Sequence, residues 1–394
     1  MVEWKKMWEL TAWDKKFQGV DKSMQSKIIP YTYLLAKDLF ALSVPTGNIK
    51  LLSTGVQEGW TTEELAGDFL SEGEVVTIPW GKSPGAQNPV KYYKGKFVTG
   101  DNRIATSLDT NVLNNKFLYY WMYSNSDVIE TFYRGAGIQH PSMFKVLTMP
   151  VPLLSISEQN RIVGILDTFT ASIDNLKEQI ALRRKQYEYY RDQLLDLEGK
   201  EGVEMKKLGE IGKCIAGATP STKESSYWDN GTIPWMNSGE VHQGIVTHTA
   251  SFITSKGYNN ASTKMLPIGT IVIALAGQGK TRGSVAITAI ELCTNQSICG
   301  VVLEDSNVIN KYVYYYLKTQ YNNLRRISSG EGTRGGLNLK MVGSYPIPLP
   351  SLQEQQRIVS ILDTFEASIQ NLEAQLSQRE KQYEYYRNKL LTFE

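Results

Sequence analysis

Residues that commonly build metal sites and disulfide frameworks are scarce in this chain. It contains 3 cysteines and 3 histidines among 394 residues. So few cysteines in a chain of this length argue for a reducing, cytoplasmic environment and exclude a framework of several disulfides. Cys214, Cys293 and Cys299 include no C-x-x-C pair and make no standard zinc spacing with His242 or His248, so we expect no metal site.

Long apolar runs are also missing. The longest candidate is TIVIALAG at residues 270–277, whereas a membrane-spanning helix needs about 20 predominantly apolar residues. The opening sequence MVEWKKMWEL lacks the apolar core of a signal peptide. We therefore expect a cytoplasmic protein without membrane association.

Familiar catalytic patterns are absent or incomplete. There is no H-E-x-x-H motif. ALAGQGKT at residues 274–281 fits a relaxed phosphate-loop pattern, but such a loop must open into a helix whose N-terminal amides bind phosphate. The sequence that follows, RGSVAITAI, is instead typical of a strand. We predict a polar hairpin here and no catalytic residues, with a nucleotide-using enzyme as the alternative that a helix after Thr281 would favour.

What the chain does have is an internal repeat. KQYEYYR occurs at residues 185–191 and again at 381–387, with matching flanks at a constant offset of 196. Between residues 149–195 and 345–391, 30 of 47 aligned pairs are identical. VEWKKMWEL near the start and VEMKKLGEI in the middle extend the match to the beginning of each half. We predict two duplicated halves joined by the flexible connector GKEG at 199–202, because units of this size are domains and not solenoid repeats.

The constant part of each half carries a heptad pattern. Its apolar stripe advances in alternating steps of four and three residues. In the first copy the stripe is Ile162, Leu166, Phe169, Ile173, Leu176, Ile180, Arg183, Tyr187, Tyr190 and Leu194. In the second copy it is Ile358, Leu362, Phe365, Ile369, Leu372, Leu376, Arg379, Tyr383, Tyr386 and Leu390. A 3.5-residue period held over more than four heptads predicts a coiled coil.

Two such stripes in one chain favour pairing with each other; packing of each helix on its own domain is the alternative. Each half enters its helix from its variable part, so a two-fold relation between the halves predicts an antiparallel pair. Arg183 and Arg379 would then be polar positions that set the register of the seam. Ser155 and Ser351 are suited to cap the two helices at their starts.

Residues outside the stripe are duplicated too. Exposed Tyr189 and Tyr385 are candidate anchors for a partner, with Arg191 and Arg387 beside them, because aromatic residues and arginine dominate binding interfaces. We predict that both copies meet the same kind of partner. Recent duplication is the alternative explanation.

The remaining part of each half is variable and predicted to be β-rich. GTIVIAL at 269–275 and ICGVVLE at 298–304 have the composition of strands, whereas residues 115–132 and 310–327 are amphipathic and helical. The formal net charge of the chain is +2, and residues 203–344 hold 14 basic and 9 acidic residues. That excess is too mild to predict strong nucleic-acid binding by the chain alone.

Two stretches resemble a known family. PIPLPSLQEQQRIVSILDTF at 346–365 closely resembles the helix entry of the specificity subunits of type I restriction-modification enzymes. GATPSTKESSYWDNGTIPW at 217–235 resembles the start of one type of their target recognition domain, with Ala218 where glycine is usual. The first variable part lacks this element and resembles a different type.

With the repeat, this resemblance predicts an α+β fold. Two β-rich mixed target recognition domains are separated by two long helices that form an antiparallel coiled coil, in a pseudo-two-fold internal repeat. The expected segments are recognition domain 1 at 1–148, a spacer helix and linker at 149–202, recognition domain 2 at 203–344 and a second spacer helix at 345–394.

The resemblance also implies a non-catalytic DNA-recognition subunit. Each recognition domain reads one half of a bipartite double-stranded DNA target, and the helices dock two methyltransferase subunits that methylate adenine. Motor-nuclease subunits complete the restriction complex. No cofactor is expected in this chain, since S-adenosylmethionine, ATP and magnesium belong to the partner subunits. A coiled-coil scaffold without a DNA function is the other alternative.

Polar loop residues beside the strands are the candidate DNA contacts. Arginine and lysine suit guanine or phosphate, and asparagine and glutamine suit adenine. In the second variable part the candidates are Thr219, Ser221, Thr222, Asn237, Gln278, Lys280, Arg282 and Arg334. In the first they are Lys82, Lys91, Asn102, Arg103, Arg134 and Gln139.

Overall fold

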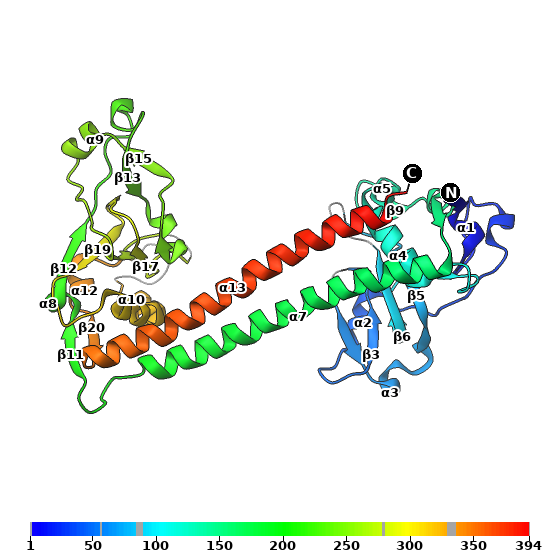
Figure 1. Ribbon diagram of the computed structural model, residues 1–394, viewed down its shortest axis with the longest axis horizontal. Coiled ribbons are helices and arrows are strands. Elements are labelled where there is room, and N and C mark those ends of the chain that lie inside the picture. Colours follow the sequence, from blue (N-terminus) through cyan, green and yellow to red (C-terminus); the bar gives the residue numbers. More distant parts are fainter. Residues whose placement is uncertain (1, 56, 84–89, 278–279, 329–335, 394) are drawn as a thin grey trace. The chain divides into compact units, whose positions relative to one another are not determined.

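The computed structural model describes residues 2–55, 57–83, 90–277, 280–328 and 336–393. The chain forms two compact units: unit 1 comprises Met1–Lys177 and Ala374–Glu394, and unit 2 comprises Glu178–Glu373. Two 40-residue helices, α7 (Ile156–Leu195) and α13 (Leu352–Leu391), each contribute to both units (Figure 1). Each unit therefore combines one globular part with portions of both long helices.

The globular part of unit 1 is built on a six-stranded sheet with the order β2-β7-β5-β6-β3-β4. Its strands are β2 (Thr11–Trp13), β3 (Ile49–Leu52), β4 (Gly59–Thr61), β5 (Ser71–Pro79), β6 (Lys91–Thr99) and β7 (Asn102–Ser107). Strands β3 and β6 run parallel, and the other neighbours are antiparallel. Beside the sheet lie α2 (Ala36–Ala41), α3 (Glu63–Ala66), α4 (Asn115–Ser124), α5 (Ser126–Glu130), β8 (Tyr133–Arg134), β9 (His140–Pro141) and α6 (Met143–Thr148). Helix α4 packs against β5 and β6.

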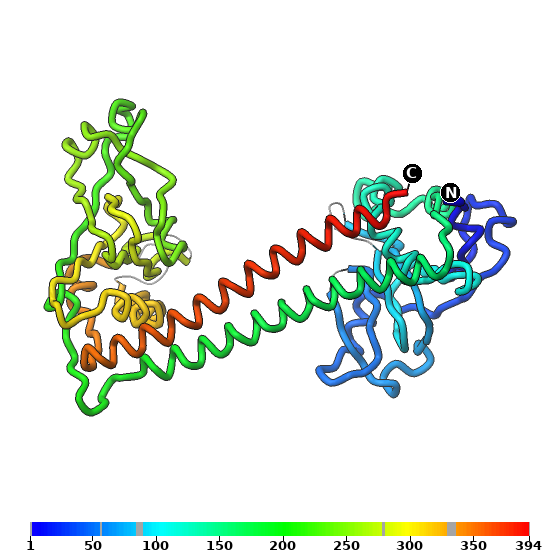
Figure 2. The backbone as a smooth tube through the Cα atoms, viewed as in Figure 1, coloured from blue at the N-terminus to red at the C-terminus, as the bar shows by residue number. Residues whose placement is uncertain are grey.

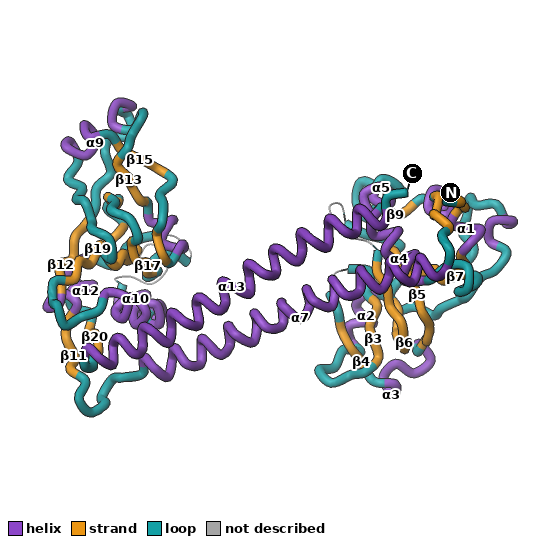
Figure 3. Tube along the Cα trace, viewed as in Figure 1, coloured by secondary structure: helices purple, strands orange, loops and turns teal. Residues whose placement is uncertain are grey.

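The globular part of unit 2 is built on two sheets, with the orders β12-β19-β16-β17-β14 and β15-β13-β18. The strands are β12 (Gly212–Ala216), β13 (Ile233–Met236), β14 (Ile245–Val246), β15 (Ser251–Ile253), β16 (Ile271–Ala274), β17 (Val285–Thr288), β18 (Cys293–Thr294) and β19 (Ile298–Leu303). The helices are α9 (Ser255–Asn260), α10 (Asn310–Thr319), α11 (Tyr321–Ile327) and α12 (Leu339–Gly343). Helix α10 packs against β16 and β17 (Figure 3). Strands β16 and β19 confirm the two strands predicted in this part.

Each of the two helical stretches predicted in the variable parts is a pair of helices. The break falls at Asn125 between α4 and α5 and at Gln320 between α10 and α11. At the first break, Asn125 Nδ2 donates to the Trp121 carbonyl at 2.9 Å, a side-chain bond that competes with continued helix. The apolar periodicity continues across both breaks, which is why the sequence suggested single helices.

A common framework flanks both globular parts. In unit 1, β1 (Glu3–Lys6) pairs with β10 (Pro150–Leu153) and leads into α1 (Met7–Leu10). In unit 2, β11 (Glu204–Lys207) pairs with β20 (Pro346–Leu349) and leads into α8 (Leu208–Ile211). The glutamate at the third position of each short helix accepts from the backbone of the lysine before it, at 2.8 Å in both copies. The predicted repeat is therefore present in the backbone structure as well as in the amino-acid sequence.

A buried glutamine anchors each long helix to its globular part. Gln159 Oε1 accepts from the Asn114 amide at 2.8 Å, and its Nε2 donates to the Val112 carbonyl at 2.8 Å. Gln355 repeats this with the Ile309 amide at 2.9 Å and the Asn307 carbonyl at 3.0 Å. Both side chains are almost fully buried, so replacing either would leave backbone groups without partners.

The start of each helix is capped as the sequence predicts. The Ser155 and Ser351 hydroxyls accept from the Glu158 and Glu354 amides at 3.3 Å. Within unit 1 the end of α13 returns to the globular part (Figure 2). There Phe393 packs against Trp121, with ring centroids 5.9 Å apart.

The predicted pairing of the two long helices is confirmed, and it is antiparallel. In unit 1, the Phe169 ring stacks on Tyr386 at 5.3 Å and 27°. In unit 2, the equivalent Phe365 ring stacks on Tyr190 at 5.6 Å and 28°. The first turns of each helix also pack into the core of their own globular part, so the alternative expectation holds for those turns alone.

The predicted polar seam positions lie over aromatic rings. The Arg183 guanidinium is 5.8 Å from the centroid of Phe365, and Arg379 is 5.8 Å from that of Phe169. A cation above an aromatic face is attracted by the ring quadrupole. Each arginine thus has a favourable place in an otherwise apolar seam and ties the register of one helix to a ring of the other.

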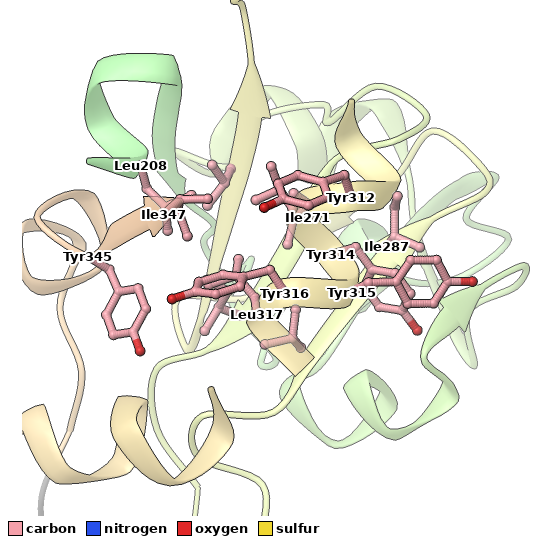
Figure 4. Close-up of a cluster of buried hydrophobic side chains, with 14 of the residues drawn as sticks. Leu208, Ile271, Ile287, Tyr312, Tyr314, Tyr315, Tyr316, Leu317, Tyr345 and Ile347 are labelled. Atoms are coloured by element: carbon pink, nitrogen blue, oxygen red, sulfur yellow. The ribbon is translucent and has the colours of Figure 1, made fainter. Parts of the chain in front are cut away.

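Buried tyrosines of α10 form much of the core of unit 2 (Figure 4). Tyr312, Tyr314, Tyr315 and Tyr316 are nearly inaccessible to solvent. The Tyr315 hydroxyl shares its single proton between two carboxylate acceptors, Asp363 Oδ1 at 2.6 Å and Glu366 Oε2 at 2.9 Å. Burial, and then these bonds to carboxylates, raise the pKa of Tyr315 far above its ordinary value.

Alkaline pH should therefore destabilise unit 2. Below the unfolded tyrosine pKa of about 10 the contribution of Tyr315 is fully present, and above it the unfolded chain loses a proton that the folded chain retains. Tyr315→Phe should lower the free energy of unfolding by roughly 1.5–3 kcal/mol at pH 8 and should lessen the further loss above pH 10. Urea unfolding from pH 8 to 11 measures both effects, with exposed Tyr189→Phe as the control. An unchanged pH profile for Tyr315→Phe would contradict the assignment.

Candidate nucleic-acid interface

Three polar loops of unit 2 meet at one edge of its five-stranded sheet. Strand β12 ends at Ala216, which is opposite Cys299 in β19. Strand β16 ends at Ala274, opposite Ile298 at the start of β19. Because these antiparallel strands share a register, the loops after β12, after β16 and before β19 emerge side by side. The edge collects residues that are far apart in the sequence.

The loop after β12 is held in place by indole donors. Trp235 Nε1 donates to the Ala218 carbonyl at 3.0 Å, and Trp228 Nε1 donates to the Ser221 carbonyl at 3.1 Å. A Cβ on Gly217 would lie 2.0 Å from the Thr294 carbonyl oxygen, so only glycine fits there. The backbone is fixed from both sides while its hydroxyl side chains remain accessible.

Thr219, Ser221 and Thr222 are exposed on this loop, as the sequence suggested. The Thr219 hydroxyl donates to Gln296 Oε1 at 2.5 Å, which links the loop to the turn before β19. Asn237 lies near the same turn, since the Asn295 amide donates to the Met236 carbonyl at 3.0 Å. Hydroxyl and amide groups at one edge can donate to and accept from base edges.

The Asn237 side chain also has a local role. Its Oδ1 accepts from the Gly239 amide at 2.8 Å, and its Nδ2 donates to Glu240 Oε2 at 2.8 Å. These bonds cap the short 3-10 helix of residues Ser238–Gln243. If Asn237 contacted a DNA base, its side-chain amide would have to bond the base and the cap at the same time.

The loop after β16 joins two antiparallel strands, β16 and β17. Residues 280–283 form a turn, so no helix follows Thr281 and the predicted hairpin is confirmed. A phosphate loop is therefore not supported here. Lys280 is exposed at the loop, whereas Arg282 is buried, so the expectation that Arg282 is an accessible loop residue is wrong. Gln278 and Arg334 lie outside the described residues.

In unit 1 three of the candidate side chains are buried and form contacts that stabilise the fold. Asn102 Nδ2 donates to the Leu52 carbonyl at 2.8 Å. Arg103 Nη1 donates to Asp101 Oδ1 at 3.0 Å, and its guanidinium lies 4.2 Å from the Trp80 ring centroid. Lys82 pairs with Glu130 and is also buried. The sequence-based view of these three as accessible loop residues is wrong, because their partners are brought in by the sheet.

The other unit 1 candidates remain accessible in part. Lys91 is half-buried at the start of β6 and donates to the Ser53 carbonyl at 2.8 Å. Burial lowers the pKa of Lys91. Arg134 is exposed in β8, and half-buried Gln139 forms a backbone bridge to Lys82. We retain Arg134 as the most accessible cation of this set.

The duplicated partner face has the same geometry in both copies. Tyr189 and Tyr385 are 58% and 59% exposed. Each packs edge-on against the next tyrosine, with centroids 5.3 Å apart at 77° in the first copy and 5.2 Å apart at 80° in the second. Arg191 and Arg387 instead turn toward rings of the protein itself. Arg191 lies over Tyr187 at 5.8 Å, and Arg387 lies over Tyr383 and Tyr123, at 5.6 Å from each. The two exposed tyrosines are thus the outward part of the face.

Comparison with known proteins identifies the family of this chain. The family model described as the type I restriction modification DNA specificity domain matches twice, at residues 41–183 and 200–380. The chain belongs to the type I restriction-modification specificity subunits. A specificity subunit of type I restriction enzyme EcoR124I/EcoR124II from Escherichia coli is 35% identical over 305 residues, covering 74% of each chain. A putative specificity subunit from Haemophilus influenzae is 29% identical over 350 residues, covering 82% of this chain and 84% of the relative.

The fold agrees with that of solved specificity subunits. The crystal structure of a type I restriction-modification system S subunit from M. genitalium superposes with a TM-score of 0.66 at 18% identity. The match covers 100% of this chain and 97% of that one. At this identity the likeness establishes the fold alone.

One residue at the candidate interface of this specificity subunit was not predicted from the sequence. Gln296 is exposed in the turn before β19 and accepts from Thr219, so it lies within the polar edge. The signal was available in the polar stretch TNQS between two strand-like segments. The proximity of Gln296 to Thr219 could not be predicted from the sequence, because the two residues are 77 positions apart.

The cysteines occupy structural positions. Cys293 and Cys299 are buried in β18 and β19, and burial raises the pKa of Cys293 to about 11. Across the described residues, no group of three or more His, Cys, Asp or Glu side chains is placed to hold a metal ion. Within the same described part of the chain, no helix is both long and apolar enough to cross a membrane.

Proposed function

We propose that this chain is the sequence-reading subunit for a bipartite double-stranded DNA target. Each globular part reads one half-site, and the two long helices dock two methyltransferase subunits that modify adenine. Motor-nuclease subunits then join to form the restriction complex. The observation that carries the proposal is the contrast between two different globular parts and two helices with the same exposed tyrosine face.

We further propose that the chain supplies recognition and no chemistry. S-adenosylmethionine would be held by the methyltransferase subunits, and ATP and magnesium by the partner subunits that use them. The near-neutral charge of the chain suits this division, because partner subunits can share the phosphate contacts that dominate affinity for DNA. A scaffold without a DNA function would keep the helices but show no dependence on DNA sequence.

The decisive experiment is a map of methylated adenines in cells with and without this gene. The proposal expects one bipartite motif, with unread bases between its halves, to lose methylation when the gene is removed. Exchanging residues 203–344 for the corresponding part of a relative should change one half of that motif and leave the other intact. Unchanged methylation after removal of the gene would refute the proposal.

Within the polar edge, Lys280 is an accessible cation suited to a phosphate or guanine. Lys280→Ala should weaken DNA binding of the assembled complex by roughly 1–3 kcal/mol if it contacts a base, and should reduce the salt dependence by about one phosphate contact if it contacts phosphate. Binding titrations on cognate DNA at several salt concentrations separate these outcomes. Lys200→Ala in the connector is the matched control, and equal effects of the two substitutions would remove Lys280 from the interface.

A further inference from the structure

The apolar seam between α7 and α13 cannot by itself decide which helix pairs with which. At nine of its ten aligned positions the two copies are identical, and the tenth exchanges Ile180 for Leu376. An α7 helix would therefore bury the same seam against the α7 of a second chain as against its own α13. The duplication creates a risk of pairing between like helices, and residues outside the seam must resolve it.

Two interhelical ion pairs flank the seam. In unit 2, Arg184 Nη2 lies 2.5 Å from Glu373 Oε1. In unit 1, Lys177 Nζ lies 3.5 Å from Glu380 Oε1. Under the repeat offset of 196, Arg184 aligns with Glu380 and Lys177 aligns with Glu373. The same two positions therefore carry positive charge in the first copy and negative charge in the second.

This reversal has opposite consequences for the two ways of pairing. When α7 pairs with α13, both flanking contacts join a cation to a carboxylate. If α7 paired with another α7, Arg184 would face Lys177, and if α13 paired with another α13, Glu380 would face Glu373. Like charges at such positions repel, and flanking charges are known to set partner choice in coiled coils.

We propose that these four charges select pairing of the two different helices and oppose pairing of like helices between chains. KQYEYYR is identical in both copies directly after Arg184 and Glu380, and the seam positions beside the charges differ only in Ile180 and Leu376. The charge reversal thus distinguishes α7 from α13, whereas their seams do not. The inference concerns assembly of the chain and does not depend on its reading of DNA.

The proposal is tested with a variant that keeps the ion pairs between α7 and α13 and removes only the repulsion between like helices. Lys177→Glu combined with Glu380→Arg keeps both intrachain ion pairs, one with reversed polarity, and leaves net charge unchanged. It also makes the two copies identical at these positions, so like helices can now form the same ion pairs between chains. Arg184→Glu combined with Glu373→Lys does the same with the opposite choice of charge.

The matched control exchanges all four charges. Lys177→Glu, Arg184→Glu, Glu373→Lys and Glu380→Arg together keep the intrachain ion pairs, the net charge and the repulsion between like helices. Full-length chains carrying two different tags are co-expressed, and mixed complexes are counted by native mass spectrometry at low salt. The native chain sets the background level of mixed complexes.

We expect both two-residue variants to raise the association constant for dimer formation by roughly tenfold or more. Four repulsive contacts per dimer become attractive, although each is partly exposed and therefore contributes little by itself. The four-residue control should stay at the native background. The difference should fade in about 1 M salt, where charges are screened within roughly 3 Å. Native-like dimerisation of both two-residue variants, or an equal rise in the control, would overturn the proposal.

Discussion

Replacing Tyr189 and Tyr385 by aspartate should leave a folded chain that no longer binds methyltransferase subunits. Each tyrosine is more than half exposed and packs on the next tyrosine of its own helix. Its other contacts, Gln193 Nε2 donating to the Tyr189 hydroxyl at 2.8 Å and Lys389 over the Tyr385 ring at 5.8 Å, are also within its own helix, so its loss costs the fold little. At an interface an aromatic anchor contributes about 2 kcal/mol or more, and burying an aspartate in its place adds an unpaired charge. We expect at least a roughly 30-fold loss of affinity at each face.

The stoichiometry makes this prediction specific. Native mass spectrometry of the co-expressed complex should find two methyltransferase subunits on the native chain, one on either single variant and none on the double variant. Tyr189→Phe with Tyr385→Phe keeps both rings and serves as the control. Two bound subunits on the double variant would show that the tyrosine faces are not the docking sites.

Removing one heptad from each long helix should change the spacing of the half-sites without changing their sequences. Seven residues of helix correspond to about 10 Å, or about three base pairs of DNA. Deleting residues 173–179 and 369–375 preserves the seam, because the four-three rhythm resumes at Ile180 and Leu376. In the shortened pair Arg184 faces Glu380, so one interhelical ion pair is retained.

A methylation map of cells carrying the shortened chain measures the effect. The expected motif has the same two half-sites with about three fewer unread bases between them. Deleting a heptad from α7 alone is the control, since it misaligns the two seams and should destabilise the pair. Recovery of the original spacing by the doubly shortened chain would rule out the helices as the spacer.

The sequence predicted those features that depend on neighbours along the chain. Helix period reports which side chains share a face, so the stripes from Ile162 and from Ile358 were enough to predict a coiled coil. Caps such as Ser155 act on an amide three residues away, and the hairpin after β16 followed from β-branched residues after Thr281. The duplication added the antiparallel direction, because two related halves meet most simply through a two-fold relation.

The candidate site was predicted less well, and the reason is the distance between partners in the sequence. Asn102 bonds a carbonyl 50 residues away, and Lys82 pairs with Glu130, 48 residues away. From sequence alone each of these looked like a solvated loop residue. Strand pairing supplied the partners that bury them, and no local pattern reports strand pairing.

By itself, then, the sequence determined the duplication, the two matching helices with their tyrosine faces, and the strand character of the segment after Thr281, since each follows from local spacing. Only the tertiary structure decided that Thr219, Lys280 and Gln296 belong to one polar edge of unit 2. It also decided that Arg184 pairs with Glu373, a contact between residues 189 positions apart. Such juxtapositions depend on the register of strands and helices, which is set by the packing of the whole unit.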